Sequence, residues 1–179
     1  ELPIVAEDLG LISEDVVALR EALALPGMRV LQFGFEGDAA NPHLPHNYVP
    51  NLVAYTATHD NDTSRGWYAS AGGAAQHRAR VYAGSDAEGI PWAFIRMVCN
   101  SVADAAIYPL QDVLGLGTEA RLNTPGRPRD NWTWRYRPDA LTHSLAGSLR
   151  EMAQLARRWT PPGQALSGDA ALLLHYDRP

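Results

Sequence analysis

The sequence predicts an α/β fold in which helices cover a parallel sheet. Four apolar runs have the composition of buried strands, three of them are followed by helical patterns, and acidic residues stand at or just after the end of each run. The runs cover residues 3–10, 28–35, 52–58 and 104–115. Four strands cannot close a barrel, but this pattern fits half of a (β/α)₈ barrel with inserted loops and helices. A doubly wound sheet is the alternative, because strand order cannot be read from the sequence.

Helical patterns lie between and after these runs. Ser13 is a good N-cap for a helix that ends at Leu23, and Asp62 or Thr63 can cap a second helix through residues 66–68. Further helices are expected at residues 76–82, 91–102 and 141–159. One face of the last helix is apolar and consists of Leu145, Leu149, Met152, Leu155 and Trp159. Residues 36–52 and 116–135 are rich in turn residues and are expected to form long loops.

The composition is that of an ordinary soluble domain. The chain has 179 residues, of which 46% are hydrophobic, and its formal net charge is −5. No apolar run reaches the roughly 20 residues of a membrane span, and the acidic balance argues against a nucleic-acid partner. The single cysteine, Cys99, excludes an internal disulfide and a cysteine-based zinc site, and we expect it to be buried. We expect a cytoplasmic protein without membrane or nucleic-acid partners.

Acidic residues follow the apolar runs, where a parallel sheet would bring the strand ends together. They are Glu7, Glu36 with Asp38, Asp60 with Asp62, and Asp112. Glycosidic-bond chemistry needs a carboxylic acid that protonates the leaving oxygen, and a second carboxylate that attacks the sugar or activates water. A glutamate at one strand end and an aspartate two strands further on could both face such a site. Any one of these acids, taken singly, also fits a helix cap.

Histidines close to these acids suggest a metal site as an alternative. His43, His46, His59 and Asp60 could ligate a metal ion, as His-Asp pairs do in metal-dependent phosphohydrolases. Such ligands usually lie on helices, whereas His59 and Asp60 end a strand and therefore point to opposite faces. The other two histidines lie in a proline-rich loop. We therefore expect no metal and no other cofactor.

Six sequence blocks, taken together, resemble the 4-α-glucanotransferases, also called amylomaltases or disproportionating enzymes, a branch of the α-amylase clan. The resemblance runs in matching order from about residue 3 to residue 160. Its blocks are Ile4-Val-Ala-Glu-Asp-Leu-Gly10, residues 25–33, Asn41-Pro-His-Leu-Pro-His-Asn-Tyr48, Tyr55-Thr-Ala-Thr-His-Asp-Asn-Asp-Thr63, residues 108–115 and residues 123–135. The resemblance implies a (β/α)₈ barrel, of which this chain would be the C-terminal half.

The resemblance also implies a role for five residues. Glu7 matches the general acid/base of the family. Asp60 matches the carboxylate that grips sugar hydroxyls and favours the oxocarbenium-like transition state, and His59 matches a residue that hydrogen-bonds the sugar at the cleavage point. Phe33 matches an aromatic side chain near the bound glucan, and Asn123 matches a polar contact from the late loop.

Two tryptophans of the late loop receive no such role. Trp132 and Trp134 are expected to pack in the protein interior, as large aromatic residues usually do.

The nucleophile of the family has no counterpart in this sequence. It is an aspartate in an Arg-x-Asp-His context on the strand before the acid/base, and this motif does not occur here. We therefore expect residues 1–160 to be the C-terminal half of a catalytic barrel and residues 161–179 to be a tail. The N-terminal remainder of the same protein would be their partner. The opening apolar residues, without an initiator methionine, agree with this expectation.

The implied activity is transfer of α-1,4-glucan segments between maltooligosaccharides by a retaining double displacement. The fragment alone would be inactive. An α-amylase-type hydrolase is the nearest rival because it shares the fold and the chemistry. A non-catalytic glucan-binding module is the rival from another functional class, and a metal phosphohydrolase would lose its activity in a chelator.

Overall fold

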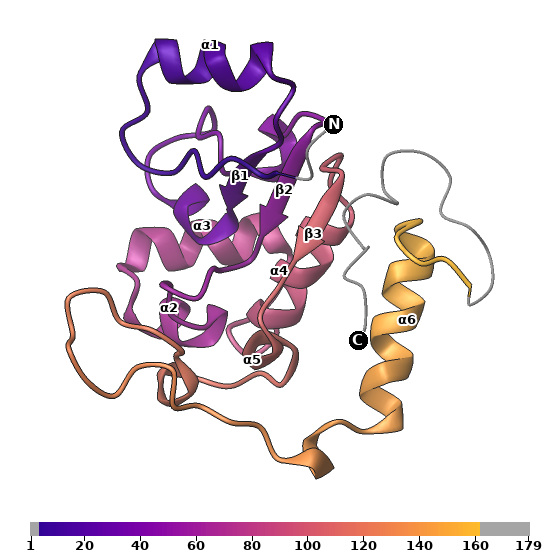
Figure 1. The fold of residues 1–179 in the computed structure, drawn as a ribbon. Coiled ribbons are helices and arrows are strands. Elements are labelled where there is room, and N and C mark those ends of the chain that lie inside the picture. The colour runs from indigo at the N-terminus through magenta and orange to yellow at the C-terminus, as the bar shows by residue number, and fades with distance from the viewer. Residues whose placement is uncertain (1–3, 162–179) are drawn as a thin grey trace, which may run out of the picture.

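A parallel sheet of three short strands forms the centre of residues 4–161, the part of the chain that the computed structural model describes. The strands are β1 (Gly27–Val30), β2 (Leu52–Tyr55) and β3 (Ala105–Ile107), in the order β1-β2-β3. In their register, Met28 pairs with Val53 and Tyr55 pairs with Ile107. The carboxyl ends of all three strands therefore lie at one edge of the sheet (Figure 1). The predicted α/β class with a parallel sheet is confirmed.

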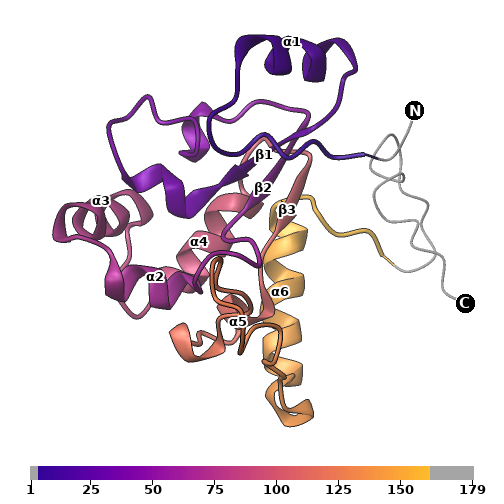
Figure 2. The same ribbon diagram turned by 60° about the vertical axis from the view of Figure 1, so that its left-hand side comes forward.

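Helices connect the strands and follow them. They are α1 (Glu14–Ala22), α2 (Ser64–Ser70), α3 (Gly73–Ala83), α4 (Ile90–Cys99), α5 (Leu110–Val113) and α6 (His143–Leu155). Short 3₁₀ turns are η1 (Leu31–Phe35), η2 (Pro45–Asn47), η3 (Thr118–Ala120) and η4 (Pro138–Ala140). In Figures 1 and 2, α1 stands at the opposite end of the molecule from α5. None of the helices within residues 4–161 is long and apolar enough to cross a membrane.

The main core lies between the sheet and α4. Leu52 and Ala54 of β2 pack in one buried cluster with Phe94 and Val98 of α4. Phe35, which follows β1, stacks on Phe94 with the ring centroids 5.2 Å apart. Because side chains alternate along a strand, the neighbouring residues of β2 point to the other face of the sheet. That other face forms the floor of the pocket described below.

A smaller core joins α4 to α6. Ile95 and Cys99 of α4 are buried there, and Leu145, Leu149 and Met152 of α6 pack against them. The predicted burial of Cys99 is therefore confirmed, and so is most of the predicted apolar face of α6. The prediction is wrong for Leu155, which is 79% exposed, because Ala156 rather than Leu155 packs against this core.

The first apolar run does not form a strand. Residues 4–9 are irregular, although the Ala6 amide donates a hydrogen bond of 2.8 Å to the Pro26 carbonyl beside β1. The amide of Met28 instead donates to a side chain, the Asp8 carboxylate, at 2.6 Å. This contact requires a glycine at position 27, since a Cβ there would lie 2.6 Å from Asp8 Oδ2. A side chain thus takes the place of the backbone ladder along this edge of the sheet.

Two further runs form shorter strands than the sequence predicts. Residues 28–35 are extended only as far as Val30, whose amide donates to His43 Nδ1 at 3.0 Å, and the chain then turns into η1. The run at 104–115 is a strand only over β3, and α5 begins directly after Pro109. An apolar run of this length cannot be distinguished from a strand followed by a short buried helix by its composition alone.

Helix α1 presents an exposed apolar face. It forms where the sequence predicts it, with Ser13 at the N-cap position, but none of its residues is buried. Val16 and Leu19 are 46% and 60% exposed, although both lie on the side predicted to face the core.

Candidate active site

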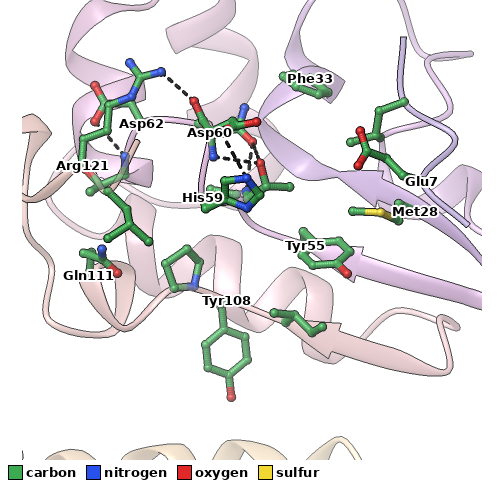
Figure 3. A pocket seen from close by; sticks show the side chains of 18 of the residues that line it. Glu7, Met28, Phe33, Tyr55, His59, Asp60, Asp62, Tyr108, Gln111 and Arg121 are labelled. Carbon is green, nitrogen blue, oxygen red and sulfur yellow. Dashed lines mark hydrogen bonds and ion pairs between the residues drawn. The ribbon is translucent and has the colours of Figure 1, made fainter. Parts of the chain in front are cut away.

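A pocket of about 750 Å³ lies over the open face of the sheet, at the carboxyl ends of the strands. Met28, Tyr55 and Ile107, one from each strand, form its floor. Its other lining residues come from residues 7–10, the loop after β2, and the segments after β1 and β3. Figure 3 shows Glu7 and Asp60 on different sides of this pocket, with Phe33, His59 and Tyr55 labelled between them. Four of the five residues to which the sequence gives a role, namely Glu7, Phe33, His59 and Asp60, therefore line one pocket.

The loop after β2, residues 57–63, holds itself in shape with its own polar groups. The Asn61 side-chain oxygen accepts hydrogen bonds from the Thr58 amide at 2.9 Å and from the Thr58 hydroxyl at 2.7 Å. The Thr58 Oγ1 atom also accepts from the amide of Asp60 at 3.3 Å. Gln32, which is buried, donates to the Asp62 carbonyl at 2.9 Å. These contacts give Asp60 a defined backbone although it lies outside regular secondary structure.

The Asp60 carboxylate is bound on one oxygen. Its Oδ1 atom accepts from Asn123 Nδ2 at 2.5 Å and lies 3.2 Å from His59 Nε2. Among residues 4–161, no protein donor is in hydrogen-bonding distance of Oδ2. An aspartate with one oxygen fixed and the other turned to a pocket can accept hydrogen bonds from a ligand hydroxyl there. Asn123 itself does not line the pocket, and it contacts the site through Asp60.

The late loop is bound to the same segment by its backbone. The Asn123 amide donates to the His59 carbonyl at 3.1 Å, and Arg121 donates to the Asp60 carbonyl at 2.7 Å. Two segments that are 61 residues apart in sequence thus meet at the two residues predicted to contact the sugar. Neither Arg121 nor its role is evident from the sequence, because an arginine in a turn-rich loop has no distinguishing pattern.

Glu7 lies in an irregular segment that its neighbour anchors. The Asp8 carboxylate, which binds the Met28 amide, also accepts from Arg29 at 3.1 Å and lies 3.5 Å from Arg20 Nε. The Glu7 side chain points the other way, into the pocket, and its own residue is exposed. Burial raises the pKa of Tyr55, and the negative charge of nearby Glu7 raises it further. Tyr55 therefore stays protonated near Glu7 and can donate a hydrogen bond.

Phe33 is 43% exposed at the pocket wall and belongs to η1. Its ring meets the His43 ring edge-on, with centroids 5.4 Å apart, and its carbonyl accepts from the Asn41 side chain at 2.9 Å. The expectation of an aromatic side chain at the site agrees with this position. Simple core packing does not describe it, since a core phenylalanine would be covered.

Several other sequence expectations are wrong or incomplete. Trp132 is 53% exposed and not in the core, and its ring lies 5.2 Å from that of His59 beside the site. Thr63, rather than Asp62, caps α2, because its hydroxyl accepts from the Gly66 amide at 3.0 Å. Trp134 is partly covered and packs near Tyr136, with ring centroids 6.4 Å apart. The acids Glu36 and Asp38 are exposed and do not line the pocket.

The four residues of the alternative metal site do not come together. His43 accepts a hydrogen bond from Val30, and His46 contacts the Tyr82 hydroxyl at 2.8 Å and the Ala39 carbonyl at 2.7 Å. Both are therefore engaged in the loop after β1, while His59 and Asp60 lie in the loop after β2. Within residues 4–161, no three His, Cys, Asp or Glu side chains form a cluster that could hold a metal ion.

The folded protein should lose stability as the pH falls through the range in which free histidine titrates. Burial, with a contribution from Arg29 and against that of Asp8, lowers the pKa of His43 from 6.5 to about 4. The unfolded chain therefore takes up a proton below about pH 6.5 that the folded chain refuses until about pH 4. Stability present above pH 6.5 is lost in this window, by about 2–3 kcal/mol. The thermal unfolding midpoint, measured across this range, should fall more steeply than in His43→Asn, which keeps an acceptor for Val30; parallel curves would contradict the prediction.

Comparison with known proteins identifies the family to which this arrangement belongs. The sequence profile of the 4-alpha-glucanotransferase family matches residues 1–142. The chain belongs to this family. All six sequence blocks that suggested the resemblance lie inside the matched residues.

The 4-alpha-glucanotransferases most similar to the chain come from diverse organisms. The enzyme of Synechocystis is 50% identical over 159 residues, and that of Thermus thermophilus is 47% identical over 169 residues. Each alignment covers 88% of this chain but only 32% and 33% of the relative. An enzyme from the plastids of Arabidopsis thaliana is also 50% identical, over 164 residues. The chain thus spans about a third of the length of the relatives it matches.

A solved structure of the same family has a similar fold. The amylomaltase of Streptococcus agalactiae, determined in complex with acarbose, matches with a TM-score of 0.84 at 32% sequence identity. The match covers 89% of this chain and 33% of that structure. The three-stranded sheet and its helices therefore correspond to a part of an amylomaltase.

Proposed function

We propose that this chain is the part of a 4-alpha-glucanotransferase that supplies the general acid/base and a transition-state-stabilising carboxylate. The substrates are maltooligosaccharides and longer α-1,4-glucans, and the reaction is a retaining transfer. The observation that carries the proposal is the placement of Glu7 and Asp60 on different sides of one pocket, with His59 and Phe33 beside them. Family membership supports the assignment, and so does the acarbose complex of the related amylomaltase.

In the first half of the proposed reaction, Glu7 donates its proton to the glycosidic oxygen as the bond between that oxygen and C1 breaks. An aspartate from the remainder of the protein, outside this chain, forms the new bond to C1. In the second half, Glu7 takes the proton from the 4-hydroxyl of an acceptor glucan. The acceptor oxygen then bonds to C1 and the aspartate leaves, which restores an α-1,4 bond.

Asp60 acts in both halves through its unpaired oxygen. Positive charge develops on the sugar ring in each oxocarbenium-like transition state, and a fixed carboxylate stabilises it. The contacts of Asp60 with Asn123 and His59 fix its position before the substrate binds. His59 and Phe33 contact the sugar around the cleavage point, and the exposed ring of Trp132 extends the same wall of the pocket.

The wider architecture forms part of the same proposal. The three parallel strands and the irregular segment 4–9 belong to the C-terminal half of a (β/α)₈ barrel, whose other half carries the nucleophile. The catalytic part ends near residue 160, and the protein acts in the cytoplasm without a cofactor. The proposed tail, residues 161–179, lies outside the described residues except for Pro161.

Activity measured with maltotriose tests the proposal. The full-length protein should release glucose and form longer maltooligosaccharides, whereas the 179-residue chain alone should do neither. The physical reason is that a retaining transfer cannot begin without the nucleophile. Glucose release by the isolated chain would contradict the assigned division of labour. Release of glucose without longer products by the full-length protein would instead indicate a hydrolase.

A further inference from the structure

Asp112 is a buried carboxylate that the proposed reaction does not use. It lies on α5, its exposure is 0%, and it does not line the pocket, although the sequence places it among the acids of the apolar runs. Its Oδ2 atom accepts from the Thr56 hydroxyl at 2.6 Å and from the Ser64 hydroxyl at 2.7 Å. Its Oδ1 atom accepts from the Ser64 amide at 2.7 Å. Both partners are also 0% exposed.

The two partners of Asp112 stand at the two ends of the loop that carries the site. Thr56 directly follows β2, and Ser64 is the first residue of α2. The intervening residues, 57–63, include His59 and Asp60. A single carboxylate therefore joins the entry and the exit of this loop from below. The late loop holds it from the other end, through the bonds from Arg121 and Asn123.

The chemistry of these contacts requires a group that only accepts hydrogen bonds. All three partners of Asp112 donate, and an ionised carboxylate offers acceptors on both oxygens without a donor. Burial raises the pKa of Asp112, while the hydrogen bonds from Thr56 and Ser64 oppose that rise. An asparagine has nearly the same shape but would turn an NH₂ group toward one set of donors. Two hydroxyls or the Ser64 amide would then have to find other partners.

We propose that Asp112 is a positioning residue for Asp60, and that its buried carboxylate sets where the Asp60 side chain stands in the pocket by joining Thr56 to Ser64. This inference rests on the proposed function of Asp60. Positioning matters because a displacement of about 1 Å at a catalytic group can lower a rate about 100-fold. Asp112 touches no substrate, so its effect should appear in turnover more than in substrate affinity.

The test uses the full-length protein with maltotriose as substrate, at a temperature well below the unfolding midpoint. Asp112→Asn should lower kcat by about 10- to 100-fold and change KM by less than about threefold. Val113→Ala is the matched control, since Val113 is its buried neighbour but packs against α4 and not against the loop. This variant should unfold at a lower temperature and keep its kcat.

A second background separates positioning from general stability. In an Asp60→Asn protein, adding Asp112→Asn should lower kcat by less than about threefold, because its effect passes through Asp60. If Asp112→Asn fails to fold, Thr56→Val and Ser64→Ala each remove a hydroxyl donor and should lower kcat by a smaller factor. An unchanged kcat in the folded variants, or an equal loss in the Asp60→Asn background, would overturn the inference. Absence of transfer by the wild-type protein would overturn the proposed function instead.

Discussion

Glu7→Gln in the full-length protein should lower kcat for maltotriose by about 100- to 10,000-fold. Glutamine keeps the size of the side chain but has no proton to give to the glycosidic oxygen. Substrate affinity should change little, because Glu7 makes no hydrogen bond with the rest of residues 4–161 that its loss would disturb. Steady-state kinetics with maltotriose, followed by glucose release, measure both quantities. Binding without turnover is the expected result.

A substrate with a better leaving group sharpens this prediction. An α-glucoside whose leaving group departs as a stable phenolate needs little protonation, so its cleavage should be much less sensitive to Glu7→Gln. Glu36→Gln is the matched control, because Glu36 is an exposed acid after η1 that does not line the pocket. Its activity should equal that of the wild-type protein. Turnover of maltotriose by Glu7→Gln within a few-fold of wild type would remove Glu7 from the mechanism.

Much of the fold could be predicted because buried parallel strands leave a strong pattern. The run at 52–58 is apolar on both faces, and its first part forms β2 between two neighbouring strands. The run at 3–10 has a similar composition but is no strand, because Asp8 binds the Met28 amide in place of a backbone carbonyl. Composition reports burial and does not report which atom satisfies a given backbone amide.

The candidate site divides along the same line. Glu7, His59, Asp60 and Phe33 were found through sequence blocks, and the structure brings them to one pocket. Asp112 belongs to the same set of acids at the ends of apolar runs, yet it points away from the pocket into the protein. Whether an acid after a strand faces a ligand or the protein depends on one or two residues of register, which the sequence does not specify. Trp132 was misjudged because exposure of an aromatic side chain cannot be read from its type.

Asp60→Asn should lower kcat by about 100- to 1,000-fold, the range observed when one preorganised electrostatic contact to a transition state is removed. The amide keeps an oxygen for one hydrogen bond but has no charge to stabilise the oxocarbenium-like state. Asp62→Asn provides the comparison within the same loop. The Asp62 carboxylate is already occupied by the Thr63 amide at 2.8 Å and the Thr118 hydroxyl at 2.8 Å, so its loss should affect kcat much less. Equal losses in the two variants would contradict the role of Asp60.

Asn123 decides whether the late loop acts on the sugar directly or through Asp60. The family resemblance implies a polar contact with the substrate, whereas the side chain donates to Asp60 at 2.5 Å. If Asn123 acts through Asp60, then Asn123→Ala should lower kcat in the wild-type background and have little further effect in Asp60→Asn. If it also contacts the sugar, the two losses should multiply and KM should rise. The double-mutant cycle, measured as kcat and KM for maltotriose, therefore separates a residue that orients the carboxylate from one that binds the glucan.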